Sequence, residues 1–296
     1  MLRRFLISVS RPHYLFRPQQ VVRRLLRQLF PPQTPEQTVT LPWGLDLNVN
    51  IDEHIGRSIW LHGLYACSVS EALWRLVDAG DLVVDAGANI GHMTGLMALR
   101  AGPSGRVLAF EPHPTIYTQL EENIARFAHA PDTAPIEAHE LALSDRGGTA
   151  GLAWGHRFDD NQGTAHLTSF PSSSHVRVAC RPLDDVVAKD LVSMLKLDVE
   201  GHEMQVLNGA RRALREGRIT HIVYEDLHPY SSSLPSFLEA RGFTVFGLGE
   251  QLHGPCLMAL NTALQDQAAP PNYLATRRPR LVKRHFAARG WRVLLS

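Results

Sequence analysis

The feature that most constrains this chain is a regular alternation of short apolar runs and amphipathic segments between residues 82 and 246. The apolar runs have the length of buried strands and fall at 82–84, 106–110, 136–141, 193–199, 220–224 and 243–246. Segments with a helical spacing of apolar residues lie between them, at 92–100, 114–127, 203–215 and 234–241. Alternation of this kind predicts an α/β fold, in which helices cover both faces of a mostly parallel sheet.

Other segments flank or interrupt this alternation. A short β-ribbon is expected within 41–61, and Ser68 and Glu71 have the spacing of a capping box at the start of a further helix. Residues 148–182 hold two strand-like runs around a polar loop, His156 to His175, whose length suggests a lid over a ligand. Beyond residue 250 the pattern fades. The expected organisation is therefore a basic N-terminal extension with an amphipathic helix, an α/β domain with its core motifs at 80–247, and a basic C-terminal tail, with bounds 1–40, 41–250 and 251–296.

The charged residues are distributed unevenly along the chain. Seven arginines and no acid precede Glu36, and seven basic residues and no acid follow Asp266. The stretch between them holds 16 basic and 29 acidic residues. An acidic core without a basic groove argues against a nucleic-acid target.

The basic N-terminal segment contains apolar residues at helical spacing over 21–29, with arginines on the other side. Such a helix could lie on an anionic membrane surface, or it could pack on its own domain or on a second subunit of a homo-oligomer. We expect packing on protein, because most amphipathic helices cover a core. No apolar run approaches the ~20 residues of a membrane-spanning helix.

The cysteines bear on compartment and chemistry. Cys67, Cys180 and Cys256 are odd in number and far apart. They argue against a disulfide framework and against a thiolate zinc site, and they suit a reducing compartment. We therefore expect a cytoplasmic protein, with contact between its basic N-terminus and a membrane surface left open.

A glycine-bearing loop follows the first strand of the alternation, in the run Asp85-Ala-Gly87-Ala-Asn89-Ile-Gly91. Gly87 allows a tight turn and close approach of a ligand, and the helix start beyond Gly91 offers free amides to an anion. A dinucleotide-binding loop would carry a middle glycine where Asn89 stands. The loop therefore suits a smaller anion, such as an amino-acid carboxylate, and favours S-adenosylmethionine over NAD.

Acids occur at the ends of the next two strands. Glu111 lies 26 residues beyond Asp85, where a carboxylate can accept hydrogen bonds from both ribose hydroxyls. The third strand runs into Ser144 and Asp145, where Asp145 could accept from an adenine amino group. Each acid alone could equally be a helix cap or a solvated turn. Together, at successive strand ends, these residues predict a nucleoside site.

The stretch 194–203, MLKLDVEGHE, combines a strand pattern with charges that are costly to bury. Lys196, Asp198 and Glu200 share one face of the expected strand, and Lys196 is expected to neutralise the acids. His202 follows, either as a proton acceptor near neutral pH or as a helix-start histidine bonded to the backbone.

Four runs now carry a resemblance: VVDAGANIGHMT, AFEPHP, LALSD and KLDVEGHEMQVLNGA. In this order and spacing, over about residues 80–247, they closely resemble the FkbM family of S-adenosylmethionine-dependent methyltransferases. The resemblance implies a Rossmann-like class I methyltransferase fold, with a mostly parallel twisted sheet and helices on both faces. Members of the family are mostly O-methyltransferases that act on hydroxyls of sugars and secondary metabolites. The two ends of the chain, 1 to about 40 and 250 to 296, lie outside the resemblance.

Position by position, the resemblance implies two sets of site residues. Cofactor binding is expected at Asp85, Gly87, Asn89, Gly91, Glu111 and Asp145, with Ser144 beside them. The reaction centre is expected at Asp198, Glu200 and His202.

Three alternatives stay open. Asp198, Glu200, Glu225 and His228 could together hold a divalent cation, although we favour a reaction without a metal. The chain could be a cofactor-binding module that has lost activity and acts as a scaffold. A nicotinamide-dependent oxidoreductase is disfavoured by Asn89 and by the lack of a Tyr-x-x-x-Lys pair.

Overall fold

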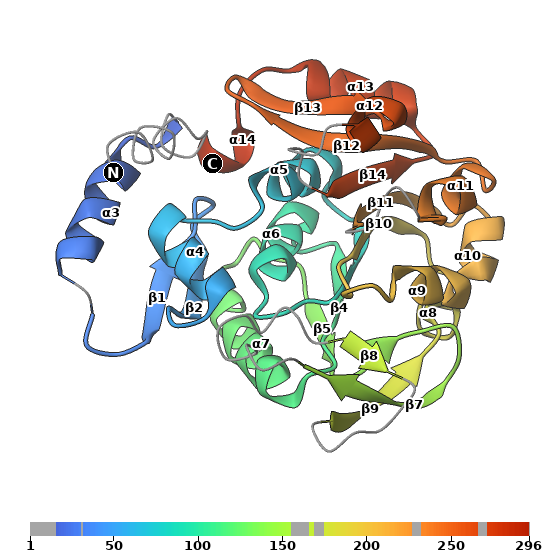
Figure 1. The fold of residues 1–296 in the computed structure, drawn as a ribbon, viewed down its shortest axis with the longest axis horizontal. Helices are drawn as coiled ribbons and strands as arrows, with labels where there is room; N and C mark the ends of the chain where they lie inside the picture. The colour runs from blue at the N-terminus through green and yellow to red at the C-terminus, as the bar shows by residue number, and fades with distance from the viewer. Residues whose placement is uncertain are drawn as a thin grey trace.

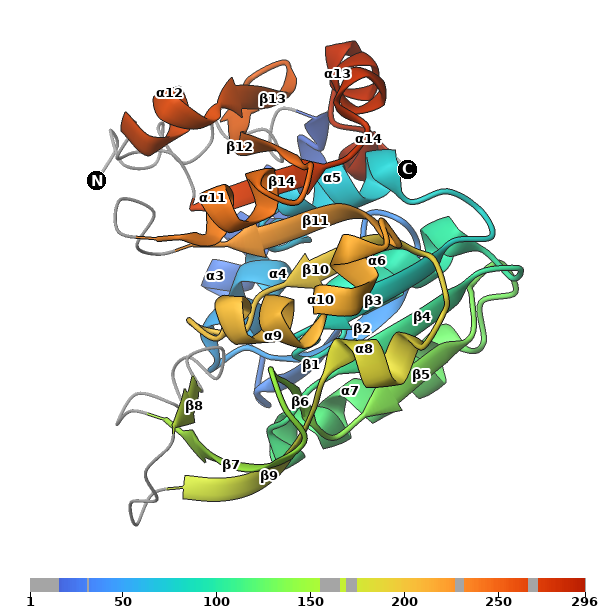
Figure 2. The same cartoon turned by 90° about the vertical axis from the view of Figure 1, so that its right-hand side faces the viewer.

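The computed structural model describes residues 16–30, 32–154, 166–168, 175–226, 232–265 and 271–295. Its centre is an eight-stranded sheet with helices on both faces (Figures 1 and 2). A two-stranded sheet precedes it in the chain, and a four-stranded sheet is inserted within it. The polar loop expected to act as a lid lies almost entirely outside the described residues.

The large sheet has the strand order β13-β12-β14-β11-β10-β3-β4-β5, which Figure 2 shows from top to bottom. Its parallel part consists of β3 (Leu82–Ala86), β4 (Arg106–Phe110), β5 (Ile136–His139), β10 (Val192–Leu197) and β11 (Ile219–Glu225). The chain runs outward from β3 to β5 and then returns to place β10 on the other side of β3. The strand order therefore reverses between β3 and β10, which is where open α/β sheets bind ligands.

Both faces of this sheet are buried, as the apolar runs predict. In β3, Val83 packs into one hydrophobic cluster and Val84 into the other. In β10, Met194 and Leu195 divide in the same way, because successive side chains of a strand point to opposite faces. The predicted Rossmann-like fold class is confirmed.

The helices on the two faces come from different parts of the chain. Helices that contribute to the first cluster are α5 (Cys67–Leu76), α6 (His92–Ala101) and α7 (Pro114–Phe127). Helices that contribute to the second are α8 (Leu183–Val187), α9 (Glu203–Gly209), α10 (Arg211–Arg215) and α11 (Leu234–Glu239). The single helix expected over 203–215 is thus divided at Ala210, whose backbone leaves the helical region.

The N-terminal ribbon lies earlier than expected. It consists of β1 (Glu36–Thr40) and β2 (Asp46–Asn50), and residues expected to continue it form the helix α4 (His54–His62). Glu53 caps α4 by accepting a hydrogen bond from the Gly56 amide. A Cβ atom at Gly56 would lie 2.1 Å from the Asn50 carbonyl oxygen, so only glycine allows this approach.

The insertion after β5 forms the four-stranded sheet. It contains β6 (Ala142–Leu143), β7 (Gly148–Ala153), β8 (His166–Thr168) and β9 (His175–Arg181), in the order β6-β9-β7-β8. The antiparallel pairs β7–β9 and β7–β8 account for the strand-like runs that interrupt the alternation.

The expectation of a basic tail after residue 250 is wrong for the described residues. This region forms β13 (Gly254–Ala259), α12 (Leu260–Gln265), β14 (Asn272–Thr276), α13 (Pro279–Ala287) and α14 (Arg292–Leu295). Strand β14 is inserted antiparallel between β11 and β12 (Thr244–Gln251), and Leu274 and Ala275 are fully buried there. The many basic residues in this region led us to expect a tail, although it contains the strand β14 of the large sheet.

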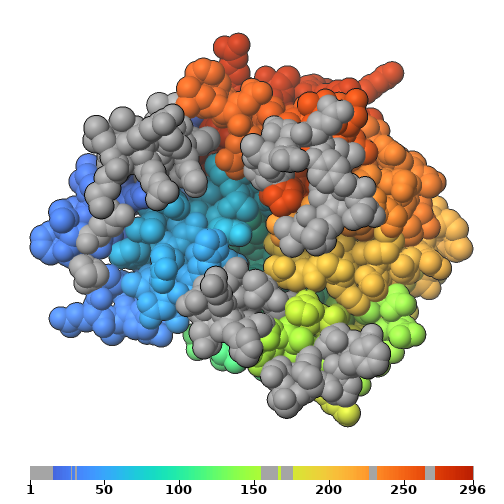
Figure 3. All heavy atoms as spheres, in the orientation of Figure 1, coloured from blue at the N-terminus to red at the C-terminus, as the bar shows by residue number. Residues whose placement is uncertain are grey.

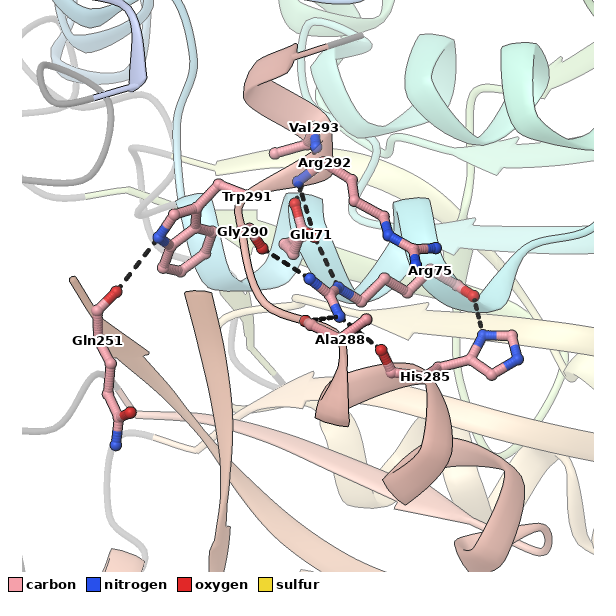
Figure 4. A network of polar contacts seen from close by, with 9 residues as sticks. All are labelled: Glu71, Arg75, Gln251, His285, Ala288, Gly290, Trp291, Arg292 and Val293. Atoms are coloured by element: carbon pink, nitrogen blue, oxygen red, sulfur yellow. Dashed lines mark hydrogen bonds and ion pairs between the residues drawn. The ribbon is translucent and has the colours of Figure 1, made fainter. Parts of the chain in front are cut away.

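A buried ion pair on α5 binds this C-terminal region to the domain (Figure 4). Arg75 Nε lies 2.6 Å from Glu71 Oε1, and both side chains are fully buried. The Arg75 guanidinium also donates to the carbonyls of Ala288 and Gly290, while Glu71 accepts from the Val293 amide. The predicted capping box is therefore wrong, because Glu71 uses its carboxylate to hold the C-terminal segment.

The helix expected near the N-terminus is present as α3 (Gln19–Leu29), which contacts α4. Its apolar stripe is largely exposed and does not pack on its own domain, while the expected alternative of packing on a second subunit stays a prediction. No helix within the described ranges is long and apolar enough to cross a bilayer.

Candidate active site

A cavity of about 360 Å³ opens at the carboxyl ends of β3, β4, β10 and β11, at the reversal of strand order. Figure 3 shows the molecule hollowed between the light-blue segment that includes α4 and the yellow segment that follows β10. The lining residues that matter below are Tyr65, Gly87, Glu111, Asp198, Glu200 and Glu225.

The loop after β3 has a backbone that few residues can adopt. Gly87, Asn89 and Gly91 all have positive φ angles, of 77°, 48° and 92°. A Cβ atom at Gly87 would lie 1.8 Å from the Asp198 carbonyl oxygen, so this position requires glycine. Asparagine is among the residues that tolerate the left-handed conformation, which explains Asn89. The loop after β3 therefore lies directly against the loop after β10.

Glu111 follows β4 and is held by this loop. Its carboxylate accepts hydrogen bonds from the amides of Asn89 and His113, each at 2.9 Å. Burial raises the pKa of Glu111 to about 7, although the two amide bonds oppose that rise. Each carboxylate oxygen keeps a further lone pair, so Glu111 can still accept from a ligand hydroxyl in the cavity.

Asp85 is buried below the cavity and does not line it. Its carboxylate accepts from the Thr94 hydroxyl at 2.7 Å and lies 3.0 Å from Lys196 Nζ. Lys196 also donates to the Gly87 carbonyl at 2.8 Å and lies 3.6 Å from Asp198. Burial acts to lower the pKa of Lys196, but Asp85 and Asp198 raise it on balance. Asp85 and Lys196 thus support the loop, and the lysine neutralises the acids as expected.

Three carboxylates converge on the other side of the cavity. Oxygen atoms of Asp198, Glu200 and Glu225 lie within 4.8 Å of one another. Burial and the neighbouring Asp198 raise the pKa of Glu200 to about 7, and they raise that of Glu225 to about 8. Burial, and to a smaller extent the negative charges of the same three acids, raise the pKa of Tyr65 to about 12. We call Asp198, Glu200 and Glu225 the acid cluster.

Glu200 has a strained backbone, with a φ of 52° that side-chain-bearing residues rarely adopt. Strain of this kind persists only where the surrounding structure imposes it, and it is concentrated at functional sites. The conformation keeps Glu200 half-buried in the cavity wall.

His202 lines the same cavity as the acids, and its ring is hydrogen-bonded to the inserted sheet. Its Nε2 atom is 2.9 Å from the Ser144 hydroxyl, which donates to Asp145 at 3.2 Å. Burial lowers the pKa of His202, although Asp145 opposes this. Ser144, beside the Asp145 expected to bind adenine, is therefore hydrogen-bonded to His202, the residue expected to take the proton.

The structure separates the remaining expected site residues into two groups. Gly87, Asn89, Glu111 and the expected reaction centre line the cavity, whereas Asp85, Gly91, Ser144 and Asp145 do not line it. For the proposed cation site, three of the four residues come together, and His228 lies outside the described residues.

Tyr65 and His92 are among the lining residues that had not been expected. Tyr65 comes from the loop between α4 and α5, outside the family resemblance, and carries no motif that could have indicated it. His92 is the first residue of α6 and is only 5% exposed. Neither of its ring nitrogens has a hydrogen-bond partner among the described residues. Burial and the charge of Lys196 lower the pKa of His92 to about 3, so its imidazole is neutral.

Comparison with known proteins assigns this architecture to a family. The profile described as the methyltransferase FkbM domain matches residues 85–245, which is more than half of the chain. Methyltransferase sdnD of Sordaria araneosa is 27% identical over 55% of this chain and 73% of its own length. The 2-O-methyltransferase NoeI of Sinorhizobium fredii is 24% identical over 52% and 67% of the two chains. The hexuronic acid methyltransferase AglP of Haloferax volcanii is 30% identical over 50% and 57%.

Proposed function

Because the chain belongs to the FkbM family of methyltransferases, we propose that it uses S-adenosylmethionine to methylate a hydroxyl group in the cavity described above. The observation that carries the proposal is the position of Glu111. A buried carboxylate, held by two backbone amides beside a glycine loop, faces a cavity at the reversal of strand order.

The residues present fit this cofactor. Glu111 can accept from ribose hydroxyls, and the loop from Gly87 to Ile90 lines the cavity near the start of α6, where the amino-acid part would lie. The unpartnered ring of His92 supplies a neutral donor at that same place. When bound, S-adenosylmethionine would supply an electrophilic methyl group.

Methyl transfer to a hydroxyl also requires an oriented oxygen and an acceptor for its proton. We assign the proton acceptor to Glu200. Its pKa of about 7 suits proton transfer near neutrality, and its strained backbone holds it in the cavity wall. Asp198 and Glu225 would orient the hydroxyl, while Lys196 limits the negative charge around Asp198.

The acid cluster could relieve its mutual repulsion by holding either a proton or a divalent cation. We favour the proton, because the Lys196 ammonium already lies 3.6 Å from Asp198 and opposes a second cation there. Activity that survives dialysis against a chelator would support this choice. Activity that is lost and then restored by Mg²⁺ would assign the cluster to a metal.

The cluster also bears on the acceptor. Three carboxylates around one small space repel an anionic compound and suit a neutral one. We therefore propose a neutral sugar or a secondary-metabolite hydroxyl as the acceptor. The relative named as a 2-O-methyltransferase supports transfer to oxygen, and the one named as a hexuronic acid methyltransferase supports a sugar-derived acceptor but not its neutral charge.

Two assays together test this function. Calorimetric titration with S-adenosylmethionine and with NAD separates a methyltransferase from a nicotinamide enzyme. Incubation with methyl-labelled S-adenosylmethionine and a panel of neutral sugars, uronic acids and phenolic or aliphatic alcohols then measures transfer. Binding followed by transfer to a neutral hydroxyl supports the proposal. Binding without transfer to any acceptor favours an inactive module, and preference for uronic acids would contradict the assigned role of the acid cluster.

Glu111→Ala is expected to weaken S-adenosylhomocysteine binding about 5- to 150-fold, corresponding to ~1–3 kcal/mol. The loss arises because ribose hydroxyls buried in the cavity lose their acceptor. Calorimetry measures it, with Glu137→Ala on the neighbouring strand β5 as the control, since Glu137 is largely exposed. Equal affinities for the native chain and the Glu111 variant, both folded by circular dichroism, would refute the ribose assignment.

His92→Phe is expected to weaken S-adenosylhomocysteine binding about 2- to 12-fold. The variant keeps an aromatic ring at this position but cannot donate a hydrogen bond to the amino-acid part of the ligand. Binding of 5′-methylthioadenosine, which lacks the amino-acid part, should not change. Equal losses for both compounds would place His92 near the nucleoside, and no loss for either would remove it from the site.

A further inference from the structure

Helix α3 packs its polar side on the protein and exposes its apolar side, whereas most amphipathic helices do the reverse. Five large apolar side chains on and just beyond it are 41–73% exposed: Val22, Leu25, Leu26, Leu29 and Phe30. We call these five residues the apolar face of α3. The other exposed large apolar residues in the described ranges are separate from one another: Leu191 precedes β10, Leu252 lies between β12 and β13, and Leu295 ends α14.

The polar side of the helix makes the contacts with the domain. Gln20 is 3% exposed, and the Arg27 guanidinium lies 5.0 Å from the centre of the Trp60 ring on α4. Arg27 thus stacks on an aromatic face, in a cation–π contact. Figure 1 shows α3 at the margin of the molecule, beside α4 and away from the large sheet. These contacts fix the orientation of the helix, and they hold its apolar face outward.

The charge of the chain segment that contains this face is of one sign. Residues 1–35 contain seven arginines and no acid. Among the arginines in the described part, Arg23 is exposed and lies close in helical angle to Leu26, at the border of the apolar face. An apolar face bordered by arginine is the pattern of a helix that lies in the headgroup region of an anionic membrane.

We propose that α3 docks this protein on an anionic lipid surface, with its apolar face among the acyl chains and the bordering Arg23 among the lipid phosphates. Eleven helical residues are too short to span a bilayer, which requires ~20, so the helix would lie in the plane of the interface. Self-association through the same face is disfavoured, because it would bring together two segments that carry only positive charge. The proposal does not depend on the reaction that the cavity performs.

The full-length chain can be tested by sedimentation with vesicles. We expect binding to equal parts of phosphatidylcholine and phosphatidylglycerol, and little binding to phosphatidylcholine alone. Attraction to the anionic surface contributes roughly a fivefold gain in affinity per arginine that reaches it, so added salt should weaken binding. The double variant Leu25→Glu/Leu26→Glu should lose binding at least about tenfold.

The matched control is Leu191→Glu/Leu252→Glu, which also adds two acids at exposed leucines but away from α3. It should bind vesicles like the native chain. Equal binding to both kinds of vesicle, or an unchanged affinity of the α3 variant, would overturn the proposal. So would sedimentation velocity that shows a dimer for the native chain and a monomer for the α3 variant, since the face would then be a subunit contact.

Discussion

Glu200→Gln is expected to lower the turnover number about 10²- to 10⁴-fold, the usual contribution of a positioned proton acceptor. Glutamine keeps the shape of the side chain but cannot take the hydroxyl proton. The affinity for S-adenosylhomocysteine should stay nearly unchanged, because Glu111 and the glycine loop are untouched. Turnover is measured by release of S-adenosylhomocysteine, with an acceptor found in the hydroxyl panel. Glu122→Gln, on the exposed side of α7, is the control.

The dependence of turnover on pH tests the same assignment. A proton acceptor must be deprotonated to act, and burial raises the pKa of Glu200 to about 7. Turnover by the native enzyme should therefore rise as the pH increases through about 7 and level off above it. Glu200→Gln should lose this rise. A large loss in His202→Ala combined with an active Glu200→Gln variant would move the role to His202, which lies beside Ser144.

Arg75→Ala is expected to reduce the free energy of unfolding by about 3–5 kcal/mol, the cost of removing one partner from a buried ion pair. The variant leaves Glu71 buried without its counter-ion. It also removes the donors to the carbonyls of Ala288 and Gly290, which hold the C-terminal segment against α5 (Figure 4). The midpoint and slope of urea unfolding, followed by circular dichroism, measure the change.

Arg106→Ala is the control for this prediction. Arg106 Nη2 lies 2.6 Å from Asp190, but both side chains are about half exposed, and exposed pairs contribute at most about 1 kcal/mol. Replacing Arg75 and Glu71 together with apolar residues should cost less than Arg75→Ala, because no charge would then remain buried. A loss below about 1 kcal/mol for Arg75→Ala would show that the C-terminal segment is held by other contacts.

Local sequence pattern was sufficient for the parallel part of the fold. Strands that are buried on both faces are continuously apolar, and the runs at β3 and β10 could be recognised because Val83 and Val84, like Met194 and Leu195, face opposite clusters. Strand β14 could not be placed in this way. It pairs with β11, about fifty residues earlier, and its position between β11 and β12 is decided by contacts that a local window does not contain.

The same reason explains the error on α5 and the orientation of α3. Ser68 and Glu71 have the spacing of a capping box, but Glu71 binds residues more than 200 positions later in the chain. The apolar stripe of α3 does not pack on its own domain, and the polar side of the helix contacts the domain instead, through Arg27 and Trp60. Both outcomes depend on partners that are distant in sequence.

For the site, sequence indicated which strand ends carry polar residues but not which side chains meet. The strand-end positions of Glu111 and Asp198 follow from the alternation, because the carboxyl ends of parallel strands share one edge of the sheet. The junction of His202 with Ser144 depends on how the loop after β10 packs against the inserted sheet. Tyr65 lies in the wall of the cavity without any motif to mark it, and His92 lies within the run VVDAGANIGHMT but was not singled out there.

The most direct measurement is a crystal structure of the protein with S-adenosylhomocysteine. We expect the ligand in the cavity between the loops after β3 and β10, with its ribose hydroxyls within hydrogen-bond distance of Glu111 and its sulfur directed toward the acid cluster. A ligand bound elsewhere, or a ribose that does not contact Glu111, would contradict the assignment of this cavity as the methyl-transfer site.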